Sequence, residues 1–331
     1  MDGHWQFEHL QDVEQLTDPR RLSILRYLMR EELTLTALGD RMGLHPAKVR
    51  YHLKRLEKDD LVRLVRTEVE GGNVRKYYRA SAAAYTLRLV VLPHSTSRGT
   101  ILAAGSDDPA LNRLAKMLCE DDRTPDMITI PQGSLNGLVS LRQGLGQMAG
   151  IHLYDAARQT FNIPYVSYFF PDRKMKVVHL NARTQGLVVA QGNPLGIRSV
   201  EDILREDVRF INRNPGSGTH LWLKRTLAER GISSEHTTGF QEGVRTHKEV
   251  VRAVARQEAD AGIAVLAALR DRDVDYIPLY EERYDLVIPE EDYQSELLEP
   301  VLDTLHSASY RNYVEQLPGV DARHAGRSQD V

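Results

Sequence analysis

The chain has 331 residues, 41% of them hydrophobic, with a formal net charge of −3 at pH 7, which predicts about two domains with sizeable cores. Its single cysteine, Cys119, excludes an internal disulfide and the thiolate cluster of a soft-metal sensor. No long apolar run occurs, and the first residues lack the basic and then apolar layout of a signal peptide, so we expect a cytoplasmic protein that does not enter a membrane.

The charge is unevenly distributed along the chain. Residues 41–79 carry 11 lysines and arginines against 5 acidic residues, whereas residues 81–331 carry 28 against 33. A basic segment in an otherwise acidic chain is typical of a nucleic-acid-binding surface. We therefore expect one face of the first part of the chain to contact nucleic acid.

Three short helices are predicted near the start of the chain. Thr17 or Asp18 can cap the first, in which leucines recur on one face. The second follows Thr34 and ends at Gly43. The third, residues 45–56, buries a stripe of apolar residues at helical spacing. Its remaining positions are basic or aromatic and suit the major groove of DNA: Lys48, Arg50, Tyr51, His52, Lys54 and Arg55.

A β-hairpin is predicted after the third helix. Residues 61–69 alternate loosely, a Gly-Gly-Asn turn follows, and residues 74–79 return with Arg75 and Lys76. Basic residues on a helix alone are usually a solvated face. Their occurrence on both the helix and the hairpin favours a DNA-binding surface.

The stretch from Leu38 to Tyr78 resembles the ArsR-type winged helix-turn-helix. The resemblance is carried by Val-Arg-Tyr-His-Leu-Lys-Arg-Leu-Glu-Lys-Asp-Asp-Leu-Val at 49–62 and by the closing Lys-Tyr-Tyr at 76–78. It implies operator DNA as a partner and a homodimer on a two-fold operator, to which a helix at 5–16 would add pairing contacts. Metal-sensing members carry cysteines before the recognition helix; residues 33–42 have none, so we expect no bound metal.

The second part of the chain alternates strands and helices. Residues 80–98 are expected to be a linker. We place the domain boundary within it, between a domain of residues 1–92 and a domain of residues 93–331. Apolar strands at 100–104, 127–131 and 149–154, separated by helices, predict an α/β fold with a parallel sheet. Ligands bind at the carboxyl ends of such strands. The polar residues at these ends are Ser106, Ser134, Tyr154 and Asp155.

A further strand, loop and helix at 208–227 has the features of an anion site. Its turn reads Gly-Ser-Gly-Thr, so backbone amides can approach a ligand closely, and Ser217 and Thr219 add hydroxyls where the helix begins. Arg213 would supply a full positive charge. The alternative is an ordinary capped turn. The spacing of the nucleotide-binding P-loop is absent.

This loop and its surroundings resemble periplasmic-type oxyanion-binding proteins. Arg213-x-x-x-Ser-Gly-Thr219 resembles the signature of the phosphate and tungstate binders, and residues 186–202 and 259–262 resemble molybdate- and tungstate-binding proteins. The resemblance, over about 100–315, implies a bilobed type II fold. Its lobes are expected at about 99–182 with 276–315 and at about 186–275, closing on a ligand about two crossing strands.

For a tetrahedral anion we expect neutral hydroxyls and amides with one or two cations. Arg183 and Thr184, on the expected crossing strand, either face the cleft or brace the hinge. Tyr154 is a weaker candidate for a ligand-binding residue. Separately, we expect the last residues of the chain, 322–331, to be frayed. The predicted ligand-binding residues are Ser106, Ser134, Arg213, Ser217, Thr219, Arg183, Thr184 and Tyr154.

These features predict a one-component transcription regulator controlled by a small oxyanion, with molybdate or tungstate first. Phosphate, sulfate or an organic carboxylate remains the alternative ligand. An enzyme of molybdenum cofactor synthesis is the alternative function, but no metalloprotease or nucleophile-elbow motif supports it. A transport receptor conflicts with the winged helix. We therefore expect no catalytic residues and no cofactor.

Overall fold

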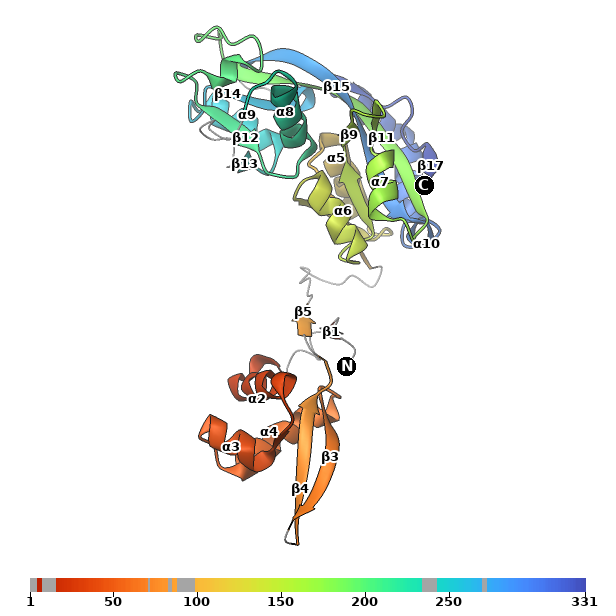
Figure 1. Cartoon of the computed structure of the whole chain (residues 1–331). Helices are drawn as coiled ribbons and strands as arrows, with labels where there is room; N and C mark the ends of the chain where they lie inside the picture. The colour runs from red at the N-terminus through yellow and green to blue at the C-terminus, as the bar shows by residue number, and fades with distance from the viewer. Residues whose placement is uncertain are drawn as a thin grey trace. The chain divides into compact units, whose positions relative to one another are not determined.

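The chain folds as two compact units, Met1–Pro93 and His94–Val331 (Figure 1). Most of the expected linker and most of the expected pairing helix at 5–16 lie outside the residues that the structure describes. The computed structural model describes residues 5–7, 16–70, 72–82, 85–87, 99–233, 243–269 and 273–331.

The first unit packs three helices against a small antiparallel sheet of strand order β2-β4-β3. Strands β3 and β4 form the predicted hairpin. A separate parallel pair joins β1 to β5. The elements of this unit are β1 (Trp5–Phe7), α2 (Pro19–Arg30), β2 (Leu33–Thr34), α3 (Leu35–Met42), α4 (Pro46–Lys58), β3 (Val62–Glu70), β4 (Asn73–Ala80) and β5 (Tyr85–Leu87).

The helix boundaries in this unit follow from their capping residues. The Asp18 carboxylate accepts a hydrogen bond from the backbone N–H of Arg20 (2.8 Å), and Thr34 caps α3 by accepting one from Ala37 (3.2 Å). Gly43 ends α3 with φ of 61°, a left-handed conformation that glycine adopts without steric cost. The predicted cap at Asp18, the start after Thr34 and the end at Gly43 are confirmed, whereas α4 extends two residues beyond the predicted end at 56.

The apolar faces of α2, α3 and α4 meet in one core, whose central side chains are at most 2% exposed: Leu25, Leu28, Leu38, Val49, Leu53 and Leu56. One expectation for this unit is wrong. Trp5–Phe7 is a strand rather than the start of a pairing helix, because its backbone pairs in parallel with Tyr85–Leu87.

The second unit is built on a ten-stranded sheet of order β13-β12-β14-β11-β15-β8-β6-β7, with β16 and β17 also paired to β11. Strand β6 pairs in parallel with β7 and β8, as predicted. The strands are β6 (Thr100–Gly105), β7 (Asp126–Pro131), β8 (Met148–Ile151), β9 (Tyr154–Asp155), β10 (Thr160–Phe161), β11 (Met175–Ala190), β12 (Phe210–Arg213), β13 (Gly243–Val244), β14 (Ala261–Val265), β15 (Val274–Pro289), β16 (Val320–Asp321) and β17 (Ser328–Asp330). The helices are α5 (Pro109–Glu120), α6 (Ser134–Arg142), α7 (Ile163–Phe169), α8 (Gly218–Glu229), α9 (His247–Ala255), α10 (Glu290–Tyr293), α11 (Glu299–His306) and α12 (Ala308–Glu315), with 3-10 turns at Asp202–Leu204 and Leu266–Ala268.

Two long strands, β11 and β15, run through both lobes of this unit (Figure 1). Each has 16 residues, and they pair antiparallel from Met175 opposite Pro289 to Ala190 opposite Val274. Strands β6, β7 and β8 with α5 and α6 form one lobe; β12, β13 and β14 with α8 and α9 form the other. Strand β15 is continuous from Val274 to Pro289.

The last residues of the chain are paired, contrary to the expectation that 322–331 would be frayed. Strand β17 pairs antiparallel with β11. The backbone groups of Met175 and Val331 exchange two hydrogen bonds of 3.0 Å. The N–H of His179 also donates to the carbonyl of Arg327 (2.8 Å). These backbone bonds hold the tail on the crossing strand although its side chains are small and polar.

Candidate ligand site and DNA interface

Four helix starts meet between the lobes of the second unit: those of α5 and α6 from one lobe and α8 and α9 from the other. Hydrogen bonds cross between the lobes here. The Asp107 carboxylate accepts one from the backbone N–H of His247 (3.1 Å), and the Gly216 carbonyl accepts one from Leu135 (3.1 Å). Helix starts carry N–H groups without intrahelical partners, which attract negative charge. The meeting of the lobes therefore suits an anion.

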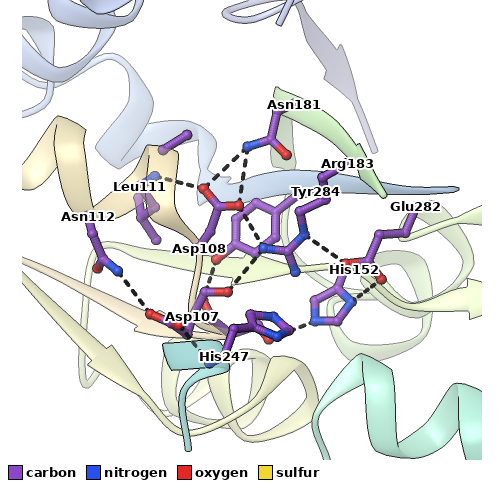
Figure 2. Close-up of polar contacts among 12 residues, drawn as sticks. Asp107, Asp108, Leu111, Asn112, His152, Asn181, Arg183, His247, Glu282 and Tyr284 are labelled. Atoms are coloured by element: carbon purple, nitrogen blue, oxygen red, sulfur yellow. Dashed lines mark hydrogen bonds and ion pairs between the residues drawn. The ribbon is translucent and has the colours of Figure 1, made fainter. Parts of the chain in front are cut away.

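Arg183, on β11, sits in a buried ion-pair network (Figure 2). Its Nε lies 2.7 Å from Glu282 Oε1 and its Nη1 2.6 Å from Asp108 Oδ2, and all three side chains are 1% exposed. Burial alone would lower the pKa of Arg183, but Glu282 and Asp108 outweigh burial and raise it. Arg183 thus braces β11 against β15 and the start of α5. Its remaining nitrogen, Nη2, has no hydrogen-bond partner in the described part of the chain.

Arg213, at the end of β12, is buried without such a network. Its Nε and Nη2 donate to the backbone carbonyls of Val244 (3.3 Å) and Arg245 (2.8 Å). Within the described ranges, Nη1 has no hydrogen-bond partner and no carboxylate forms an ion pair with this guanidinium. Burial lowers the pKa of Arg213 to about 10. The charge of Arg213 is therefore buried without an ion-pair partner, and more distant carboxylates, Asp107 first, compensate it only in part.

His152 connects the ion-pair network to a predicted serine. Its Nδ1 lies 2.7 Å from Glu282 Oε2, and its Nε2 lies 2.7 Å from the hydroxyl of Ser106. Burial lowers the pKa of His152 despite the carboxylate beside it. Burial alone would raise the pKa of Glu282, but His152 and Arg183 outweigh burial and lower it to about 2. Glu282 therefore remains ionised at neutral pH.

Three of the predicted hydroxyls, those of Ser134, Ser217 and Thr219, lie at helix starts and keep protons to donate. Ser134 accepts a hydrogen bond from the backbone N–H of His152 (3.2 Å), and Thr219 accepts one from the Gln185 amide (3.1 Å). Ser217 caps α8. A hydroxyl that accepts in this way can still donate its own hydrogen to a ligand. The structure gathers all four predicted hydroxyls in the interlobe region, each at most 3% exposed: Ser106, Ser134, Ser217 and Thr219.

His247, the first residue of α9, was not predicted as a site residue. Its side chain is fully buried, and neither ring nitrogen has a hydrogen-bond partner among the residues described. Burial, together with Arg213 and Arg183, holds the pKa of His247 well below its ordinary value, so the ring is neutral. A neutral imidazole offers one N–H donor and one acceptor.

Two predicted residues lie outside this buried cluster. Thr184 follows Arg183 on β11, and side chains alternate along a strand, so its half-buried side chain takes the other face. Its carbonyl accepts from Tyr276 (3.0 Å), which indicates a bracing role. Tyr154 is half-buried under the guanidinium of Arg225, which lies 4.7 Å from the ring centroid. It lines a neighbouring cavity.

Several members of the cluster were missed by the sequence reasoning. Three of these residues could have been found from the sequence. The Ser-Asp-Asp-Pro sequence at the start of α5 and the Thr-His pair at the start of α9 both place polar residues at a helix start. His152 follows a buried strand and Glu282 lies on one, and no local sequence pattern distinguishes either residue. The missed residues are Asp107, Asp108, His152, His247 and Glu282.

The lobes touch closely at Gly218. A Cβ atom built on this glycine would lie 2.3 Å from the carbonyl oxygen of His152, on the other lobe. We expect Gly218→Ala to hold the lobes apart and to weaken ligand affinity at least tenfold (~1.4 kcal/mol), while each lobe stays folded. Isothermal titration with the ligand would measure this, with Lys224→Ala on the exposed face of α8 as the control. Unchanged affinity of the Gly218 variant would contradict the role of this contact.

The first unit presents its basic residues from α4 and the hairpin. A groove between them is lined by Arg50, Lys54, Arg75 and Lys76, together with the acidic Glu32, Asp40 and Glu57. Tyr51 is 56% exposed, and the Arg55 guanidinium lies 5.1 Å from its ring centroid. Lys48 is also exposed. A basic helix and a basic hairpin that share a groove form a surface suited to duplex DNA.

His52 does not belong to this surface. Its side chain is buried, and Nδ1 lies 3.8 Å from Asp18 Oδ2 at the start of α2. Burial lowers the pKa of His52 despite that carboxylate. Position 52 is one residue before the buried Leu53, so the ring falls on the edge of the apolar stripe and packs inward. The expectation that His52 contacts DNA is therefore corrected.

We expect Arg50→Ala and Arg55→Ala each to weaken binding to DNA from upstream of the protein's own gene. A lost base contact costs about 1–3 kcal/mol, and a lost phosphate contact lowers the salt dependence by about one unit of slope. Fluorescence anisotropy over a series of salt concentrations would separate the two. Lys116→Ala, an exposed change in the second unit, is the control. Full affinity in both arginine variants would contradict the assignment of α4.

In the ranges that the structure describes, no group of three or more histidine, cysteine, aspartate or glutamate side chains is arranged to hold a metal ion. No helix in those ranges combines the length and apolar content needed to cross a bilayer.

Two family models match the chain. A model described as a PBP superfamily domain matches residues 120–306, and a helix-turn-helix domain model matches residues 16–65. These matches confirm the predicted helix-turn-helix domain, the periplasmic-binding-protein-like domain and the α/β fold class.

Proteins similar to this chain include two uncharacterized relatives and one solved structure. The uncharacterized protein YvgK of Bacillus subtilis is 34% identical over 196 residues, which are 59% of this chain and 63% of that protein. This chain thus spans less than two thirds of that relative. An uncharacterized Clostridium pasteurianum protein, encoded in the 5' region of a 2Fe-2S ferredoxin gene, is 32% identical over 98 residues, 29% of this chain and 87% of that one. A phosphate-bound structure from Clostridium perfringens, described as a candidate ABC-transporter substrate-binding protein, matches with a TM-score of 0.50 at 13% identity, covering 67% of this chain and 98% of that chain.

Proposed function

We propose, from the premise that this chain belongs to the PBP superfamily, that it is a one-component transcription regulator whose binding to operator DNA is controlled by a small oxyanion. In this proposal the winged helix binds DNA and the lobes of the second unit close on the ligand. The protein acts in the cytoplasm as a homodimer and carries no catalytic step.

The buried guanidinium of Arg213 carries the proposal of an anionic ligand. Arginine keeps its proton at neutral pH even in a buried site. Its Nη1 has no partner among the described residues, while its other donors are held by neutral carbonyls. An isolated buried charge costs several kcal/mol, which a bound anion would offset. The unpaired Nη2 of Arg183 and the ring of His247 add donors in the same interlobe cluster.

The hydroxyls favour a compact oxyanion over an extended ligand. Ser134, Ser217 and Thr219 each keep an O–H to donate, and the starts of α6 and α8 supply backbone N–H groups beside them. Together these groups can surround a tetrahedral dianion. Molybdate or tungstate is our first choice because of the sequence resemblance. Phosphate, sulfate and small carboxylates are the alternatives.

Thermal melting of the full chain with molybdate, tungstate, phosphate, sulfate and acetate would test the proposal. A ligand present at 100 times its Kd should stabilise the second unit by about 2.7 kcal/mol. The same ligand should then change the affinity for DNA from upstream of the protein's own gene. No stabilisation by any of these anions would remove the anion site. Stabilisation without any change in DNA affinity would remove the regulatory coupling.

A further inference from the structure

A cavity of about 230 Å³ lies beside the proposed anion site, at the boundary between the lobes. Its lining comes from β9, β10 and α7 of one lobe, from α8 of the other, which contributes Gly218, and from β15. The proposed oxyanion does not use it. Five aromatic rings and one guanidinium dominate its lining: Tyr154, Phe161, Tyr165, Trp222, Tyr280 and Arg225.

The aromatic side chains are arranged to receive a flat group. Trp222 stacks on Tyr280 with ring centroids 4.0 Å apart and an angle of 20° between planes. Tyr154 and Phe161 lie 4.9 Å apart and are tilted by 56°. All four are half-buried and line the cavity. Such surfaces favour stacked or edge-on contacts with another ring.

Arg225 gives the cavity a positive edge. Its guanidinium lies over the Tyr154 ring, and its Nε is 3.2 Å from the exposed carboxylate of Glu229 on the same helix. The Arg225 side chain is 29% exposed and its Nη1 also donates to the Tyr154 carbonyl (3.5 Å), but Glu229 is 58% exposed, so solvent weakens the ion pair and the guanidinium can exchange Glu229 for a ligand. The other charge in the lining, Glu282, is already paired with Arg183. A carboxylate is therefore the ligand group that Arg225 favours.

The volume of the cavity limits its ligand to a single ring or two fused rings. A water molecule occupies about 30 Å³ in the liquid, so a cavity of 230 Å³ holds much more than one solvent molecule. Pockets for drug-sized ligands measure about 300–1,000 Å³, which is larger than this cavity. One aromatic ring, or two fused rings, with a carboxylate fits between these limits.

We propose that this cavity is a second effector site that binds a planar aromatic carboxylate. The ring lies among the aromatic walls and the carboxylate pairs with Arg225. Because the walls come from both lobes, occupancy stabilises the closed arrangement, as the oxyanion does in the neighbouring site. The assignment depends on the cavity and not on the identity of the oxyanion.

Tryptophan fluorescence provides a direct test, since the chain has two tryptophans, Trp5 and Trp222. In a Trp5→Phe background of the full chain, benzoate and indole-3-carboxylate should change the emission of Trp222 saturably. Cyclohexanecarboxylate and benzamide, which lack the aromatic ring and the charge respectively, should bind at least tenfold more weakly. Arg225→Met and Phe161→Ala should each weaken the response to the aromatic acids at least tenfold and leave the melting response to oxyanions in place.

Three results would overturn the inference. The first is the absence of a saturable change with either aromatic acid up to millimolar concentration. The second is equal binding of cyclohexanecarboxylate, which would show nonspecific apolar contact. The third is displacement of the aromatic acid by a stabilising oxyanion, which would place both ligands in one site. In each case a melting response to oxyanions would still stand, so this failure is distinguishable from failure of the proposed function.

Discussion

Replacement of Arg213 by methionine is expected to remove the melting response to every oxyanion. The guanidinium donates to two backbone carbonyls and has one further nitrogen without a partner in the described part of the chain. A charge-assisted hydrogen bond to a buried anion contributes about 1.5–3 kcal/mol, and two such bonds would account for a loss of affinity of about a hundredfold or more. Isothermal titration with the stabilising oxyanion would measure the loss.

A matched control and a rescue variant make this result specific. Arg209→Met changes an exposed arginine near the start of the same strand, where it pairs with Asp260, and should bind the oxyanion normally. Arg213→Lys keeps the charge but loses the forked geometry, so it should bind with intermediate affinity. Retention of full affinity by the methionine variant, with a normal melting curve, would refute the anion site.

Replacement of Arg183 by methionine is expected to cause the largest loss of stability. The change leaves Asp108 and Glu282 as buried carboxylates without their cation. Removal of one partner from a buried ion pair costs about 3–5 kcal/mol. Urea denaturation of the full chain, followed by Trp222 fluorescence in a Trp5→Phe background, would measure it. Arg173→Met, which removes an exposed partner of Glu291, is the control and should cost less than about 1 kcal/mol.

The loss of stability in Arg183→Met is expected to depend on pH. The pKa of Glu282 is lowered from 4.5 to about 2 in the folded chain. A carboxyl group with a depressed pKa stabilises the fold fully above the unfolded value, and this stabilisation is lost as the pH falls from about 4.5 towards 2. Arg183→Met removes part of the depression. The difference in stability between the wild type and the variant should therefore narrow below pH 4.5. A constant difference across this range would contradict the role of the Arg183–Glu282 pair.

In the proposed function, the two lobes close around a bound anion, and this closure controls DNA binding. Asp107 of one lobe already accepts a hydrogen bond from the first residue of α9 on the other, at 3.1 Å. An anion bound by Arg213 would add contacts between the same helix starts. The expected effect of Gly218→Ala tests this geometry independently, because it changes the approach of the lobes without removing a donor.

The sequence by itself determined the helix starts, the helix ends and the buried helix faces, because these depend on residues close together in the chain. Capping by Asp18 and Thr34, the left-handed stop at Gly43 and the apolar stripe of α4 all act within a few residues. The same holds for Ser217 at the start of α8, because a strand, a Gly-Ser-Gly turn and a helix place that hydroxyl without further help. These signals predicted the helices of the first unit and the hydroxyls of the candidate site, whereas the two-lobed domain was implied by the resemblance to oxyanion-binding proteins.

The tertiary structure alone decided which charges are compensated. Arg183 and Glu282 are 99 residues apart and meet because β11 and β15 pair in a specific register. Asp107 reaches His247 across 140 residues because the lobes approach each other. No periodicity or capping rule extends over such separations, so the buried network was invisible in the sequence.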